Sequence, residues 1–150
     1  MKLIEKNKKA YFDYFVEDTV EAGIVLTGCE IKSVRAGQVS LSDCFCHIDK
    51  GEAYLKNCYI APYKHGSIHN ADPKQNRKLL LSKKEISRLI GKVKEKGFSL
   101  IPLQLYFKGQ WVKVLLGLCK GKKLHDKRQV TKEKELMRQA GRDISNMQKG

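Results

Sequence analysis

The clearest pattern in the chain is a strict alternation of apolar and other residues between positions 111 and 119. One face of an extended chain there would carry only aliphatic side chains: Val112, Val114, Leu116 and Leu118. Successive side chains of a strand point to opposite faces, so this alternation predicts a strand packed against a core. Residues 98–107 predict a partner strand across a turn at 108–110. Pro102 within that partner indicates an edge position or a bulge.

Two more strands and a short helix are predicted near the N-terminus. Aromatic and β-branched residues favour strands over residues 11–16 and 20–26, and the polar break at 17–19 predicts a hairpin between them. Residues 29–35 then have the spacing of a short helix. Charged residues are mixed into this core-forming stretch, where packing alone would not place them: Glu21, Glu30, Lys32 and Arg35. These groups therefore either pair with each other or face a partner.

A second hairpin is predicted from residues 44–48 and 53–60. The sequence Asp49-Lys50-Gly51 separates the two runs, and its glycine accepts the positive φ that a tight turn requires. Residues 63–76 follow as a long polar stretch, which predicts a functional or flexible loop.

One long helix is predicted to begin after Ser82. Ser82 and Glu85 form the Ser-x-x-Glu pattern of a capping box, and Gly97 supplies a C-terminal stop. Apolar residues recur on one face between them: Ile86, Leu89, Ile90 and Val93. The pattern as a whole predicts a mainly β fold, an antiparallel barrel of the oligonucleotide-binding (OB) type with one long and one or two short helices.

The composition changes after Cys119. Residues 120–150, here called the basic tail, contain ten Lys and Arg against four Asp and Glu, and no aromatic residue. Such a segment cannot bury enough apolar surface to fold alone, so it is predicted to be disordered, or helical only on a partner. The predicted organisation is a barrel over residues 1–119 followed by the basic tail over residues 120–150.

Net charge indicates the class of partner. The 150 residues carry 30 Lys and Arg against 16 Asp and Glu, a formal net charge of +14, so a polyanion such as RNA is the leading partner. No run approaches the ~20 apolar residues of a membrane span, and the N-terminus lacks a secretory signal. We therefore expect a cytoplasmic protein with reduced cysteines and no membrane partner.

Candidate catalytic and metal chemistry is sparse. The only ligand-like cluster is Cys44-Phe45-Cys46-His47, but alternation on a strand sends Cys46 and His47 to opposite faces. The same geometry argues against Cys46 and His47 as a thiol nucleophile and its base. There is no phosphate-binding glycine loop and no zinc-protease or serine-elbow motif. We expect no enzyme activity, no cofactor and no metal.

Several blocks together resemble the small protein B family, the SsrA-binding proteins of bacteria. The resemblance spans nearly the whole chain and rests on Asn7-Lys8-Lys9-Ala10, residues 21–35, Gly51-Glu52, Arg77-Lys78-Leu79-Leu80-Leu81, Pro102-Leu103 with Tyr106, Gly121-Lys122-Lys123 and His125-Asp126-Lys127-Arg128. It implies an OB-like barrel that binds the tRNA-like domain of transfer-messenger RNA (tmRNA) and acts in trans-translation on stalled ribosomes. It also implies a tail that enters the decoding centre of the small subunit, and elongation factor Tu as a partner through tmRNA.

The resemblance, with the basic N-terminal arm, implies two sets of site residues. The tmRNA-facing candidates are Lys8, Lys9, Glu21, Lys32, Arg35, Arg77, Lys78 and Leu80. The ribosome-facing candidates in the tail are Lys122, Lys123, His125, Asp126, Lys127 and Arg128. The chain departs from the family where the tail commonly carries a Trp, since Leu136-Met137 stands there.

Alternatives remain open for several of these residues. Lys32 and Arg35 could pair with Glu21 or Glu30 on the surface instead of meeting phosphates. Glu21 would either accept from a base amino group or hold a basic neighbour in place, and Leu80 belongs either to the core or beneath an unpaired base. A generic single-strand RNA-binding barrel is the alternative function.

Overall fold

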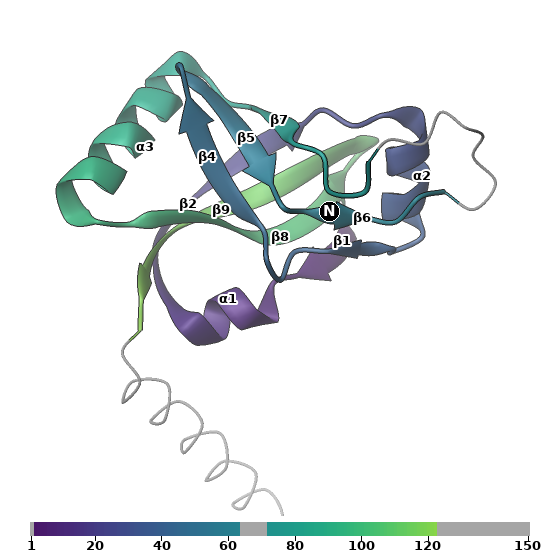
Figure 1. Ribbon diagram of the computed structural model, residues 1–150, viewed down its shortest axis with the longest axis horizontal. Coiled ribbons are helices and arrows are strands. Elements are labelled where there is room, and N and C mark those ends of the chain that lie inside the picture. The colour runs from purple at the N-terminus through teal and green to yellow at the C-terminus, as the bar shows by residue number, and fades with distance from the viewer. Residues whose placement is uncertain (1, 64–71, 123–150) are drawn as a thin grey trace, which may run out of the picture. The chain divides into compact units, whose positions relative to one another are not determined.

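The computed structural model describes residues 2–63 and 72–122 (Figure 1). Within these residues the chain forms nine strands and three helices, and the predicted mainly β, antiparallel barrel is confirmed. In chain order the elements are β1 (Lys2–Lys6), α1 (Lys8–Asp13), β2 (Tyr14–Ile24), α2 (Gly28–Arg35), β3 (Val39–Ser40), β4 (Phe45–Asp49), β5 (Glu52–Lys56), β6 (Tyr59–Ile60), β7 (Arg77–Leu80), α3 (Lys83–Lys96), β8 (Ser99–Lys108) and β9 (Trp111–Gly121).

Seven strands form one sheet in the order β1-β8-β9-β2-β7-β5-β4, and β3 pairs with β6 in a small second sheet. The inner face of the large sheet encloses one core, to which β5, β7 and β9 contribute fully buried side chains: Leu55, Leu79, Val114 and Leu116. The alternation over residues 111–119 is confirmed, because Val112, Val114, Leu116 and Leu118 all point into this core.

The prediction of an N-terminal hairpin is wrong. Residues 14–24 form the single strand β2 without a break at 17–19, and α1 precedes it. The helix forms because the Asn7 side chain caps it, accepting from the Ala10 amide at 3.1 Å. Its Nδ2 also donates to the carbonyls of Leu41 and Pro102. These buried contacts override the strand preference of the aromatic residues that follow.

Helix α1 covers a second, smaller apolar cluster on the outer side of β8 and β9. The cluster consists of Ala10, Ile101, Leu103 and Cys119, flanked by Tyr11, Tyr14 and Val16. Cys119 lies opposite the core-facing residues, as predicted, yet it is fully buried because the helix covers it. Both faces of the sheet are therefore packed at this point.

Pro102 lies at a bulge, beyond the last residue of β8 that pairs with β1. The register of β8 against β9 shifts between Pro102 and Gln104. Strand β1 pairs with the other side of β8 and reaches only as far as Gln104. Both predicted alternatives thus apply: the register shifts at Pro102, and β1 does not extend alongside it, so a residue without an N–H donor is tolerated there.

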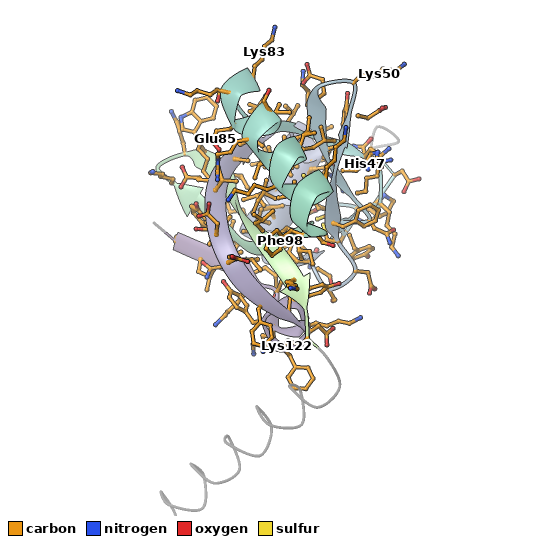
Figure 2. All side chains as sticks on the ribbon, turned by 90° about the vertical axis from the view of Figure 1, so that its left-hand side faces the viewer. His47, Lys50, Lys83, Glu85, Phe98 and Lys122 are labelled. Atoms are coloured by element: carbon orange, nitrogen blue, oxygen red, sulfur yellow. The ribbon has the colours of Figure 1, made fainter. Side chains whose placement is uncertain are left out.

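The two predicted helices are confirmed, and so is the predicted cap of the longer one. In α3 the Ser82 hydroxyl accepts from the Glu85 amide at 3.2 Å, and Gly97 ends the helix at a φ of 66°. Figure 2 shows α3 lying across one side of the barrel, with Lys83 and Glu85 in its first turn and Phe98 just past its last residue. Helix α2 lies on the other side in Figure 1 and begins with a capping box formed by Thr27 and Glu30.

A buried ion pair joins α2 to β7. The Arg77 Nε donates to Glu30 Oε2 at 2.6 Å, and the two side chains are only 1% and 6% exposed. The guanidinium also donates to the carbonyls of Cys58, Pro73 and Gln75. Glu30 accepts from the Thr27 amide with its other oxygen. One buried network thus holds the start of α2, the start of β7 and the chain between β5 and β6.

Replacing Arg77 by Leu should lower the free energy of unfolding by about 3–5 kcal/mol, because it leaves the Glu30 carboxylate buried without its partner. Urea unfolding measures this loss. The matched control is Lys78→Ala, which removes the exposed Lys78–Glu52 pair and should cost no more than ~1 kcal/mol. Equal costs for the two variants would contradict a structural role for the buried pair.

Candidate nucleic-acid interface

Glu21, Lys78 and Leu80, three of the expected RNA-facing residues, lie on the solvent side of the large sheet. Gly23 of β2 lies opposite Leu80 of β7, and alternation from this pair places Glu21 and Lys78 on the same face. Tyr106 of β8 contacts Glu21, and Lys113 of β9 lies opposite Tyr106. We call this surface the outer sheet face, defined by Glu21, Lys78, Leu80, Tyr106, Lys108 and Lys113.

Glu21 is held by two neighbours on this face. The Tyr106 hydroxyl donates to Glu21 Oε2 at 2.5 Å, and Lys108 Nζ lies 3.3 Å from Oε1. The hydrogen bond from Tyr106, followed by that from Lys108, lowers the pKa of the Glu21 carboxyl. Burial, and then Glu21, raise the pKa of the Tyr106 hydroxyl. Of the two roles expected for Glu21, the geometry favours holding a basic neighbour, Lys108, in place.

Leu80 belongs to the surface and not to the core. Its side chain is 55% exposed, whereas Leu79 beside it is buried. A Cβ at Gly23 would lie 3.3 Å from the Leu80 side chain, so the glycine lets this leucine lie close over β2. Lys78, on the same face of β7, forms an exposed ion pair with Glu52 at 3.3 Å. An exposed leucine beside a lysine is the arrangement expected for an apolar contact to a base near a phosphate.

Lys32 and Arg35 are exposed on α2, and the alternative that they pair with Glu21 or Glu30 is wrong. Both carboxylates are occupied by other partners, and neither cation forms an ion pair within the described residues. They lie over aromatic rings instead: Lys32 Nζ is 5.2 Å from the Tyr63 ring centre and the Arg35 guanidinium 5.9 Å from that of Phe107. Because Phe107 precedes Lys108, Arg35 lies near one end of the outer sheet face.

The remaining candidates lie elsewhere. Lys8 and Lys9 are exposed on α1, where Lys9 lies 3.4 Å from Asp43, and Figure 1 shows α1 well apart from α2. The expectation that Arg77 faces RNA does not fit its geometry. Its side chain is 1% exposed and its donors are used by Glu30 and backbone carbonyls, so we exclude it from the interface. Of the candidates in the tail only Lys122 is described, since Lys123, His125, Asp126, Lys127 and Arg128 lie outside the described residues.

Tyr106, Lys108 and Lys113 were not among the residues expected on this face; Lys108 is exposed and Lys113 half-buried, whereas Tyr106 is buried and contacts Glu21. The sequence contains a signal that could have found them, since alternation around Leu105, Phe107, Val112 and Val114 leaves these three on the opposite face. Their contact with Glu21 could not be deduced, because it joins strands far apart in the sequence.

The structure also bears on catalytic and metal chemistry. On β4, Cys46 is buried and His47 exposed, so they face opposite sides as alternation predicted. Burial raises the pKa of the Cys46 thiol to about 12, which disfavours the reactive thiolate. Among the described residues, no cluster of three His, Cys, Asp or Glu side chains could hold a metal ion. In the same residues, no helix is long and apolar enough to cross a bilayer.

The fold and its exposed cations define a small antiparallel β-barrel protein with a basic surface suited to RNA. A family model described as SmpB protein matches residues 4–146, and the chain belongs to that family. The expected resemblance is thereby confirmed.

Individual relatives agree with this membership. Proteins named SsrA-binding protein from Anoxybacillus flavithermus and Bacillus subtilis are each 53% identical over 99% of this chain and 96% of their own length. One from Listeria monocytogenes is 53% identical over 98% of this chain and 96% of its own length. A solved structure called "tmRNA-SmpB: a journey to the center of the bacterial ribosome" has a similar chain. It matches with a TM-score of 0.68 and 51% identity over 80% of this chain and 85% of that one.

Replacing Glu21 by Gln should lower the pKa of Tyr106, because the anionic carboxylate that disfavours the tyrosinate is removed. The pKa should stay above its usual value, since burial of the phenol remains. Ultraviolet difference titration measures this, with Tyr106→Phe identifying the signal among the six tyrosines. Glu52→Gln, on β5 of the same sheet, is the control and should leave the pKa of Tyr106 unchanged. An identical titration in the Glu21 variant would rule out the hydrogen bond.

Proposed function

We propose that the chain binds tmRNA and delivers it to stalled ribosomes for trans-translation. The observation that carries this proposal is the near full-length identity of 53% to proteins named SsrA-binding protein, SsrA being another name for tmRNA. The likeness to a chain of a tmRNA–SmpB structure supports it. The chain then acts by binding and not by catalysis, in the cytoplasm where ribosomes translate.

The physical chemistry of the barrel supports binding to folded RNA. Lys32 and Arg35 are exposed cations without carboxylate partners in the described part of the chain, so they can replace counterions at phosphates without first breaking an ion pair. Leu80 supplies an exposed apolar surface on the outer sheet face. This combination of cations that position RNA and an apolar group that contacts a base fits recognition of a shaped RNA surface.

We assign the two halves of this function to different parts of the chain. In this proposal the barrel, residues 1–119, docks on the tRNA-like domain through α2 and the outer sheet face. The basic tail, residues 120–150, enters the decoding centre and contacts ribosomal RNA through Lys122, Lys123, His125, Asp126, Lys127 and Arg128. Elongation factor Tu meets the complex through the tmRNA. The high density of positive charge in the tail supports a role on a large polyanion.

Separate Lys32→Ala and Arg35→Ala variants should each weaken binding to tmRNA and reduce the slope of log affinity against log salt by roughly 0.7–0.9, as expected for one lost phosphate contact. Filter binding over a range of salt concentrations measures both quantities. The matched control is Lys94→Ala, an exposed lysine on α3, on the side of the barrel away from α2 (Figure 1).

Two results would contradict this assignment. Equal losses for Lys94→Ala and the α2 variants would show that only net charge matters. Competition by poly(U) as effective as that by tmRNA would favour the generic single-strand RNA-binding alternative.

The double variant Lys127→Ala/Arg128→Ala should retain tmRNA affinity within about twofold and lose tagging of proteins from stalled ribosomes. The reason is that these cations contact ribosomal RNA in the proposal, whereas the barrel holds tmRNA. Binding is measured on isolated tmRNA and tagging in a reconstituted translation reaction. The control is Lys32→Ala, for which added tmRNA should restore tagging. A parallel loss of binding and tagging in the tail variant would refute the division of labour.

A further inference from the structure

Trp111 is exposed where packing gives no reason for a tryptophan. Its side chain is 68% exposed, more than any other large hydrophobic residue of the described chain. It begins β9, directly after the β8–β9 turn, and lies opposite Lys108. The next residue, Val112, points into the core, so the indole stays on the opposite side of the strand. An indole presents a large apolar face, and leaving it in water is unfavourable unless a partner covers it.

Two lysines lie on the same side of the β8–β9 hairpin as this indole. Lys108 lies opposite it in the β8–β9 register, and Lys113 follows two residues later on the same side of β9. Glu21 holds Lys108 with an Nζ–Oε1 distance of 3.3 Å, which fixes the direction of that side chain. The exposed tryptophan therefore shares its side of the hairpin with two lysines, Lys108 and Lys113.

We propose that Trp111 stacks on an unpaired base of the bound RNA while Lys108 and Lys113 contact the phosphates on either side of it. This inference rests on the proposed function and names a contact within it that the family resemblance did not supply. An aromatic plane flanked by cations matches a nucleotide, which combines a flat apolar base with an anionic phosphate. The two lysines on the side of the indole favour an anionic partner such as RNA over an uncharged apolar one. The site would extend the outer sheet face from Leu80, through Glu21, to the tip of the β8–β9 hairpin.

The chain itself provides the probe, because Trp111 is its only tryptophan. Titrating the full-length protein with tmRNA should change the intrinsic fluorescence in step with binding followed independently by filter binding. It should also shield the indole from acrylamide. Trp111→Ala should weaken tmRNA binding roughly 5- to 150-fold, the range for loss of one base stack. Trp111→Phe should recover most of that loss because a phenyl ring can still stack.

Phe45→Ala is the matched control, since Phe45 is an exposed aromatic residue on β4, and it should bind tmRNA like the unmodified chain. Unchanged fluorescence and unchanged affinity of Trp111→Ala, with tmRNA still bound, would overturn the stacking contact and leave the proposed function standing. Failure of the unmodified chain to bind tmRNA would overturn both. A fluorescence change on raising the protein concentration without RNA would also overturn the proposal, by assigning the indole to a second copy of the chain.

Discussion

The rest of the structure depends on the ion pair between Arg77 and Glu30. Charges this deeply buried are tolerated only when their hydrogen-bonding capacity is satisfied, and here each group has several partners. The pair therefore permits one arrangement of α2 against β7 and of both against the turn after β5. Any shift of the helix would leave two charges in the core without partners. The position of α2, and with it of its exposed cations, follows from that constraint.

The same pair determines which side of β7 faces solvent. Arg77 points inward to reach Glu30, so alternation sends Lys78 outward, buries Leu79 and exposes Leu80. Gly23 on β2 leaves room for that leucine, and Glu21 two residues earlier holds Tyr106 and Lys108 from the other side. The inward direction of Arg77 is thus linked to an outer sheet face that carries an exposed leucine, Leu80, and a lysine held in place, Lys108.

The sequence correctly predicted the elements that depend on residues close to one another in the chain. The Ser82 cap, the Gly97 stop and the alternation of β9 each depend on residues within a few positions, and each was confirmed. Arg77 and Lys78 could not be told apart in this way, because they are adjacent basic residues and yet Arg77 is buried and Lys78 exposed. Only the distant Glu30 decides which one is buried. Helix α1 was missed for the same reason, since the Asn7 cap is held by carbonyls of Leu41 and Pro102 far along the chain.

The distribution of carboxylates explains why a chain with sixteen acidic residues can still present a positive surface. The charge of Glu30 is buried and paired with Arg77. Asp18 forms an ion pair with Arg88 of α3 at 2.9 Å, away from α2. On the outer sheet face the charge of Glu52 is paired with Lys78, whereas the charge of Glu21 would repel phosphate. Two donors already share that charge, which reduces the repulsion and directs Lys108 toward the hairpin tip. An acidic residue placed this way orients the positive surface instead of cancelling it.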